Sequence, residues 1–307
     1  MRGSIGGVMA LVVAAGMALP VSAQVERCEY LIAHGAIIVY KPYRVEYRIS
    51  ERQLQKDGET KAVEFTQAAV IGLQGVWMNS RADAPSPEEE SPSTNVCVYD
   101  PIAGLRTTWS APGKQATRMR IAEIEASHSS CAKKETFEAE LSRAKPVVED
   151  LGTETIQGYV AHGVRTSRSF PTLVNGKSKT IVRSVEIWRT GIPGLNGAAG
   201  IELTDHDHLD DPWFWSKSEK LAYFRGNVPE FFEAAHGSIS LLVRELVDDP
   251  RYGSRSEELH DFRQDDPGSV AFQPPEGYKI VMKKAPASAC PSEKDAATTE
   301  PPPLPAE

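Results

Sequence analysis

One short acidic segment carries the side chains best suited to bind a metal ion. It reads Asp-His-Asp-His-Leu-Asp-Asp over residues 205–211. On an extended backbone His206 and His208 point to the same side with their Cα atoms about 7 Å apart, and Asp210 or Asp211 supplies a third ligand. Catalytic zinc takes three protein ligands and keeps a fourth position for water. The spacing therefore supports the hypothesis of a zinc-dependent hydrolase.

An acidic loop in solvent explains the same segment without a metal. No HExxH or other spaced ligand set accompanies the two histidines, and His-x-His alone is a weak signal. The sequence also has no GxSxG elbow, Walker loop or dinucleotide fingerprint. The glycine-rich stretch 191–200 contains an early proline and predicts a flexible loop. Metal chemistry is the enzymatic alternative that the sequence leaves open.

Aromatic residues gather directly after the acidic segment, in a chain that is otherwise poor in them. They are Trp213, Phe214, Trp215, Tyr223, Phe224, Phe231 and Phe232. Aromatic side chains provide a large contact area, and a dense apolar cluster is rarely left exposed without a purpose. Three alternatives remain open: the cluster caps the open end of a sheet, lines a site for a hydrophobic ligand, or forms a patch that binds a partner.

The N-terminus has the pattern of a cleavable secretory signal. Arg2 supplies the positive charge, and the apolar run 5–19 is shorter than the roughly 20 residues that span a bilayer. Val21-Ser22-Ala23 places small residues before the cleavage site. We therefore expect a signal peptide at 1–23 and an exported protein, periplasmic or extracellular. No later apolar stretch reaches membrane length, so no transmembrane segment is expected in the mature chain.

The four cysteines, Cys28, Cys97, Cys131 and Cys290, all follow the signal. An even number of cysteines in an exported protein predicts disulfides. The sequence does not choose among the pairings. Cys97 with Cys131 would close a local loop, and Cys28 with Cys290 would join the two ends of the chain.

The formal net charge of −8 restricts the classes of partner. Nucleic-acid binding requires clustered Lys and Arg, as does docking on anionic lipid. Both are disfavoured by this charge. An acidic protein can still hold a lipid or another hydrophobic ligand in an apolar site.

Alternation of apolar and polar residues dominates the sequence and predicts antiparallel strands. Residues 44–49 alternate strictly, and Asp57-Gly58 has the composition of a hairpin turn. An amphipathic helix is expected at 133–145, where Pro146 ends it. The expected strands are 44–49, 63–65, 68–77, 95–100, 105–110, 155–169, 179–189, 238–247, 257–263 and 277–283.

These elements predict a mainly β chain of the α+β class, folded as a curved antiparallel sheet or an open half-barrel with one or two helices. Residues 24–284 are expected to form a single β-rich domain. Within it, 81–94 is predicted to be a mobile loop because its prolines and acids cannot bury a face. The proline-rich segment 285–307 is predicted to be a disordered tail.

Several segments resemble an uncharacterised family of exported bacterial proteins. The resemblance rests on residues 147–158, 163–166, 186–188, 248–253 and 272–278, which read VVEDLGTETIQG, GVRT, EIW, DDPRYG and FQPPEGY. It covers about residues 147–280 and implies location and architecture, because the family has no assigned activity. The chain departs from the family pattern at 190–237, where the aromatic-rich segment is an insertion.

The predicted pattern of long strands around a helix is also similar, more loosely, to the open half-barrel of periplasmic lipoprotein carriers. The favoured function is therefore noncatalytic binding of an apolar ligand or of an envelope partner protein. A zinc-dependent hydrolase centred on His206 and His208 is one alternative, and a purely structural envelope protein is the other.

Overall fold

The computed structural model describes residues 42–55, 58–72, 76–83, 93–111, 113–123, 144–174, 177–192, 223–224 and 239–284. These residues are mostly in β-strands, as the sequence predicts. The strands are β1 (Tyr43–Leu54), β2 (Thr60–Ile71), β3 (Trp77–Asp83), β4 (Thr94–Asp100), β5 (Leu105–Ala111), β6 (Gln115–Arg120), β7 (Val147–Ile156), β8 (Tyr159–Val174), β9 (Lys177–Ile192), β10 (Ile239–Asp249), β11 (Gly253–Arg263) and β12 (Lys279–Met282), and a 3₁₀ turn, η3 (Ser269–Phe272), precedes the last one.

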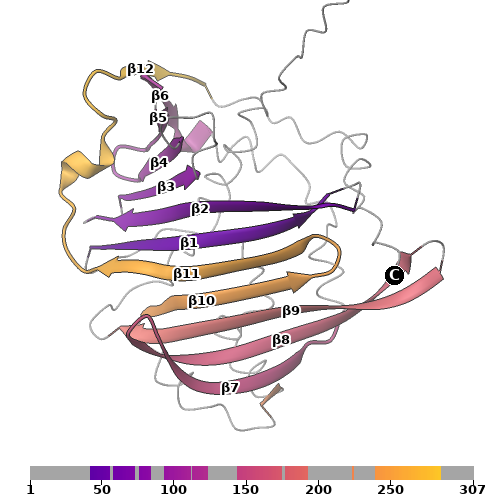
Figure 1. Ribbon diagram of the computed structural model, residues 1–307. Helices are drawn as coiled ribbons and strands as arrows, with labels where there is room; N and C mark the ends of the chain where they lie inside the picture. Colours follow the sequence, from indigo (N-terminus) through magenta and orange to yellow (C-terminus); the bar gives the residue numbers. More distant parts are fainter. Residues whose placement is uncertain are drawn as a thin grey trace, which may run out of the picture.

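The twelve described strands form one open, curved sheet (Figure 1). Its order is β12-β6-β5-β4-β3-β2-β1-β11-β10-β9-β8-β7. Two antiparallel meanders, β1–β6 and β7–β11, meet where β1 pairs with β11. The short β12 runs parallel to β6 at one edge, and β7 is the other edge. The predicted curved, mainly antiparallel sheet is confirmed.

Strand β1 shows why the alternating pattern produces a sheet with two unlike faces. Tyr43, Val45, Tyr47 and Ile49 are buried, whereas the residues between them are partly or fully exposed. The predicted turn after β1 is also confirmed. Gly58 has a φ of +85°, and the Gln55 N–H donates to the Glu59 carbonyl at 2.8 Å.

Two segments that the sequence presents as single strands are hairpins. The apolar run 68–77 contains the end of β2 and the start of β3, which pair antiparallel with Ile71 opposite Trp77. The N–H of Gly72 donates to the Val76 carbonyl at 2.8 Å. The prediction of one strand was wrong because it gave the apolar residues on both sides more weight than Gly72 and Gly75, which are typical of turns.

The strand predicted at 155–169 is likewise interrupted. Gln157 and Gly158 adopt φ values of +52° and +83° and connect β7 to β8. Positive φ at both central residues is the geometry of a type I′ hairpin turn. Glutamine is a poor indicator of that geometry, so the sequence prediction missed both the turn and strand β7.

The ends of two predicted irregular segments also belong to strands. Residues 81–83 of the predicted loop 81–94 complete β3, and Thr94 opens β4. Arg81 donates to Asp83 at 2.6 Å and stacks over the Phe65 ring at 3.6 Å from its centroid, which explains how charged residues remain in the sheet. Residues 190–192 of the predicted insertion 190–237 complete β9.

Several predictions lie outside the described residues. They are the signal peptide at 1–23, the centre of the loop at 84–92, most of the helix at 133–145 and the tail at 285–307. Within the part of the chain that the structure describes, no helix is both long enough and apolar enough to cross a membrane.

The turn between β10 and β11 is built around a buried ion pair. The Arg251 Nε and Nη2 atoms donate to the two carboxylate oxygens of Asp249 at 3.0 and 2.8 Å, and the Arg251 N–H donates to the same carboxylate at 3.0 Å. The Arg251 guanidinium lies 4.9 Å from the Phe170 ring centroid, and Arg183 Nε lies 3.6 Å from Asp249. This turn therefore connects β8, β9 and β10.

Gly253 completes the turn where it meets β1. Its φ is +113°, and a Cβ atom there would lie 1.7 Å from the Arg52 carbonyl oxygen. Only a residue without a side chain permits this approach. The DDPRYG segment of the family resemblance is thus a structural turn in this protein.

We expect Gly253→Ala to lower the free energy of unfolding by about 3 kcal/mol or more, because the added methyl group collides with backbone rather than with a flexible side chain. Gly58→Ala is the matched control. Gly58 also has positive φ, but no atom lies within 4 Å of the position that a Cβ atom would take, so a loss of about 1–2 kcal/mol is expected. Urea unfolding measures both, and equal losses would contradict the role assigned to the close approach.

We expect Asp249→Asn to lower the free energy of unfolding by about 3–5 kcal/mol, because the substitution leaves the buried Arg251 without its carboxylate. The control is Glu46→Gln, which removes an exposed pair with Arg44 and should cost less than about 1 kcal/mol. Urea unfolding of both variants checks the difference, and a loss at Asp249 no greater than at Glu46 would show that the turn does not depend on the ion pair.

Candidate ligand-binding face

The buried face of the sheet carries a continuous apolar cluster, which we call the floor. Every floor residue is at most 6% exposed, and all come from strands of the one sheet. They are Tyr43, Val45, Tyr47, Ile49, Phe65, Ala69, Ile71, Trp77, Val185, Ile187, Leu241, Leu242 and Leu259. The floor therefore extends across both meanders and over the junction between them.

Aromatic rings pack at two places on the floor. The Trp77 ring stacks on the Tyr99 ring of β4 with their centroids 5.5 Å apart. The ring centroids of Tyr43 and Phe262 of β11 are 6.0 Å apart. Tyr99 and Phe262 are partly buried and lie at the margin of the floor. Such rings supply flat apolar area with little conformational freedom to lose on binding.

Charged side chains interrupt the floor beside the junction. Glu245 of β10 and Glu257 of β11 are directly opposite in the ladder and are 1% and 0% exposed. Arg255 Nη2 donates to Glu257 at 2.8 Å, and its Nε lies 3.9 Å from Glu51 of β1. Ionised groups are retained in such surroundings only when they are paired, so this arginine contributes to holding β11 against β1.

Tyr47 connects the charged groups to the apolar ones. Its hydroxyl donates to the Leu242 carbonyl at 3.2 Å. Burial raises the pKa of Tyr47 well above its ordinary value, and the negative charge of Glu257 raises it further, while Arg189 acts in the opposite direction. Tyr47 is therefore a neutral hydrogen-bond donor in the folded protein.

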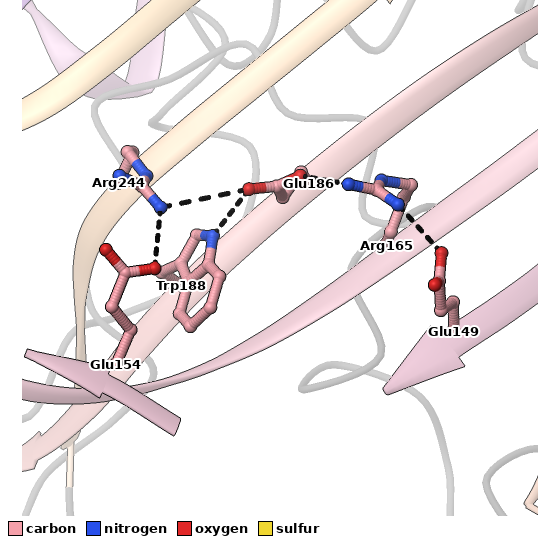
Figure 2. Close-up of polar contacts among 6 residues, drawn as sticks. All are labelled: Glu149, Glu154, Arg165, Glu186, Trp188 and Arg244. Atoms are coloured by element: carbon pink, nitrogen blue, oxygen red, sulfur yellow. Dashed lines mark hydrogen bonds and ion pairs between the residues drawn. The ribbon is translucent and has the colours of Figure 1, made fainter. Parts of the chain in front are cut away.

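The opposite face of the sheet carries a row of alternating charges, which we call the charge ladder (Figure 2). Arg165 of β8 donates to Glu149 of β7 and to Glu186 of β9, each at 2.8 Å. Arg244 of β10 lies 3.9 Å from Glu186 and 3.4 Å from Glu154 of β7. The hydrogen bond to Glu186 is the largest cause that raises the pKa of Arg165 above its ordinary value.

Trp188 supports the side chains of the charge ladder. Its Nε1–H donates to Glu186 at 2.7 Å, and the Arg244 guanidinium lies 5.2 Å from its ring centroid (Figure 2). Gly163 lies directly opposite, and a Cβ atom there would approach the Trp188 ring to 2.7 Å. The VVEDLGTETIQG, GVRT and EIW segments of the family resemblance thus converge on one network, which the sequence did not reveal.

Two hollows of about 460 and 470 Å³ lie along the sheet. Ser50 and Ser256 line both of them. The first is lined by further serines and by Arg165 and Glu186, and it exposes more polar than apolar surface. Its chemistry does not suit a hydrophobic ligand. The second hollow is mostly apolar and has Ile49 and Phe65 of the floor in its lining, so the floor residues remain the candidate binding surface.

Most of the site residues that the sequence singles out lie outside the described residues. These are His206, His208, Asp210, Trp213, Phe214, Trp215, Phe231 and Phe232. Tyr223 and Phe224 are described and partly buried. The described residues contain no group of three or more His, Cys, Asp or Glu side chains placed to hold a metal ion.

Cys97 is the one cysteine among the described residues. It is buried in β4 and is disulfide-bonded. Cys28, Cys131 and Cys290 lie outside the described residues, so the pairing of the four cysteines stays a prediction.

The sequence prediction did not single out the charged residues of the floor, although their positions carried a signal. Glu257 is two residues from Leu259, and Glu245 is two residues from Val247, so each occupies an inward-facing position of its strand. A glutamate at a position where the alternation expects an apolar, inward-facing residue indicates a buried charge.

Comparison with known proteins gives remote structural likeness only. No protein-family model matches the sequence, and no curated protein matches it. The chain is similar to a DUF1329 family protein from Desulfovibrio piger, at 10% identity and a TM-score of 0.27, with 83% of this chain and 99% of that chain covered.

Two further solved structures are similar at the same level. One is a candidate outer membrane lipoprotein-sorting protein domain from Vibrio parahaemolyticus, at 9% identity and a TM-score of 0.29, covering 81% of this chain and 95% of that one. The other is a LolA superfamily protein from Nitrosomonas europaea, at 8% identity and a TM-score of 0.27, covering 82% of this chain and 97% of that one. Their descriptions agree with the looser similarity to lipoprotein carriers, while the segment pattern of the uncharacterised family stays a prediction. Likeness at this level carries no argument about activity.

We expect the free energy of unfolding to fall as the pH rises above about 10, because the unfolded chain then releases the Tyr47 proton while the folded protein retains it. The stabilisation is complete below the unfolded-state pKa and is lost toward the higher folded-state pKa. Tyr47→Phe should flatten this slope by at most about 1.4 kcal/mol per pH unit.

Urea unfolding at several pH values measures the slope. Val182→Ala is the control, because that residue is 51% exposed and carries no titratable group, so the slope should be unchanged. An identical pH dependence in wild type and Tyr47→Phe would disprove the assignment.

Proposed function

We propose that this protein is an exported, noncatalytic binding protein that holds an apolar ligand, such as a lipid, against the floor. The observation that carries the proposal is the extent of the floor, a contiguous cluster of thirteen buried apolar side chains that crosses a single open sheet. A one-layer sheet cannot bury such a face by itself. In the proposal the aromatic insertion 190–237 and the ligand complete the second layer.

The floor provides enough surface for useful affinity. Each methylene group that is buried contributes about 0.8 kcal/mol. An acyl chain that buries about ten methylenes therefore gains about 8 kcal/mol from leaving water, and the affinity is what is left after the cost of association is subtracted. The rings of Tyr99 and Phe262 at the margin of the floor suit contact with such a chain.

Two other functions remain distinguishable by experiment. Docking of an envelope partner on the aromatic insertion predicts a complex with a protein rather than a bound lipid. The hydrolase hypothesis depends on His206, His208 and Asp210 alone, and it predicts stoichiometric zinc that is lost in His206→Ala. Both remain proposals from the sequence.

The test is to purify the mature protein from a bacterial periplasm, extract bound lipids for mass spectrometry, and titrate the delipidated protein with a fluorescent fatty acid. We expect lipid in the extract and saturable fluorescence binding. Phe262→Ala should weaken that binding about tenfold, because the loss of apolar contact at the floor margin costs about 1.4 kcal/mol.

Val182→Ala is the matched control, since Val182 is a 51% exposed apolar residue of β9 and should leave the affinity unchanged. Far-UV circular dichroism confirms that both variants are folded. Absence of extracted lipid together with absence of saturable binding would reject the proposal, as would equal weakening by the two substitutions.

A further inference from the structure

The sheet ends at β7 on an edge of unusual charge. Its sequence, VVEDLGTETI, contains three carboxylates and no Lys or Arg. The side chains of Glu149, Asp150 and Glu154 are all exposed in the folded chain, as are Thr153 and Thr155. Among the described strands, β8 is the only neighbour of β7. The other side of β7 is therefore an unpaired edge of the described sheet.

The hairpin geometry shows where the free backbone groups of β7 point. The Gln157-Gly158 turn closes a two-residue hairpin in which Ile156 is opposite Tyr159. In such a hairpin the flanking residues exchange the hydrogen bonds, and the pairs then alternate along the strand. Thr155 and Thr153 consequently direct their N–H and C=O groups away from β8, toward the open side.

The charge ladder indicates what would suit that open side. Across neighbouring strands the row runs from Arg48 of β1 to Glu258 and Arg244, and then through Glu186 and Arg165 to Glu149 of β7. Positive and negative side chains alternate throughout. The row ends on Glu149, which is 58% exposed and forms an ion pair with Arg165 on its inner side. A strand added beside β7 would continue the alternation if it placed Lys or Arg opposite Glu149.

We propose that β7 binds an extended basic segment of another protein as an additional strand of the sheet. The Thr153 and Thr155 backbone groups supply the ladder hydrogen bonds, and Glu149 and Glu154 recognise basic side chains of the partner. A second copy of this chain is a poor occupant, because two β7 strands would bring like charges together. The bulge between Asp150 and Gly152 further limits regular self-pairing.

This surface is separate from the floor, so the proposal does not depend on the bound ligand. Asp150 also takes part in holding the edge, since it accepts a hydrogen bond from the Gly152 N–H at 2.8 Å and contacts His162 Nε2 at 2.7 Å. Both contacts are made within the β7–β8 pair, at the bulge between Asp150 and Gly152. They leave the stretch 153–155 regular and available for pairing.

The test uses the whole mature protein and a synthetic peptide that alternates lysine with threonine and valine, with a glutamate-for-lysine peptide as control. Isothermal titration calorimetry measures the affinity, and hydrogen exchange measures protection of the Thr153 and Thr155 amides. We expect the basic peptide alone to bind and to protect those amides. Glu149→Gln should weaken binding severalfold, whereas Glu64→Gln, an exposed carboxylate of β2, should not.

The decisive pair of variants changes one residue. Thr155→Pro removes the outward N–H without removing a bond to β8, and an edge strand tolerates proline at such a position. We expect it to weaken binding at least tenfold, while Thr155→Ala, which keeps the amide, binds like wild type. Circular dichroism verifies the fold, and the wild-type exchange data stand even if the proline variant does not fold.

Three results would overturn the proposal. The first is binding of both peptides alike, or of neither. The second is binding that weakens with Glu149→Gln but leaves the Thr153 and Thr155 amides unprotected, which indicates ionic contact without strand addition. The third is a dimer in sedimentation velocity that Thr155→Pro disrupts, which assigns the edge to a second copy of this chain.

Discussion

The antiparallel pairing of β1 with β11 is the constraint on which the rest of the described sheet depends. It is the ladder that joins the two meanders, and it runs nearly the full length of both strands. The floor crosses this junction, and the buried glutamates and Tyr47 lie beside it. At its end, Gly253 allows the β10–β11 turn to approach the β1 backbone. Loss of this ladder would separate the floor into two halves, neither of which could bury its apolar residues.

Both faces of the sheet carry Arg–Glu pairs, but the pairs have different roles because one face is buried and the other is partly exposed. On the buried face, Arg255 pairs with Glu257 because isolated ions are unfavourable there. On the other face, Arg165 and Glu186 are partly exposed, and their pairing gives register and order more than stability. This division explains how a chain with a quarter of its residues charged forms a continuous apolar cluster. The acidic surplus is left on exposed positions such as those of β7.

Much of the fold was predictable from local pattern, because alternation determines which residues of a strand are buried. Strand β1, its Asp57-Gly58 turn and the hairpin of β4 and β5 follow from the sequence. The reversals at Gly72 and at Gln157-Gly158 did not, because the apolar and alternating residues on both sides outweighed single glycines, although glycine is typical of turns. The β1–β11 pairing was also not predictable from the sequence, because periodicity identifies strands without identifying the strands they pair with. For the site, the alternation indicated inward residues such as Tyr47, while the convergence of Glu149, Arg165 and Trp188 required the register of neighbouring strands.

The position of β11 in the chain has a consequence for biogenesis. Arg44 near the start of β1 pairs with Arg263 near the end of β11. The β1–β11 ladder therefore cannot form until almost the whole described chain has been synthesised. Folding that depends on such distant contacts is slow, and unpaired strand edges are prone to aggregate meanwhile. The first meander therefore presents an unsatisfied edge until β11 has been synthesised. Until β11 arrives, β1 is the strand most open to pairing with the wrong neighbour.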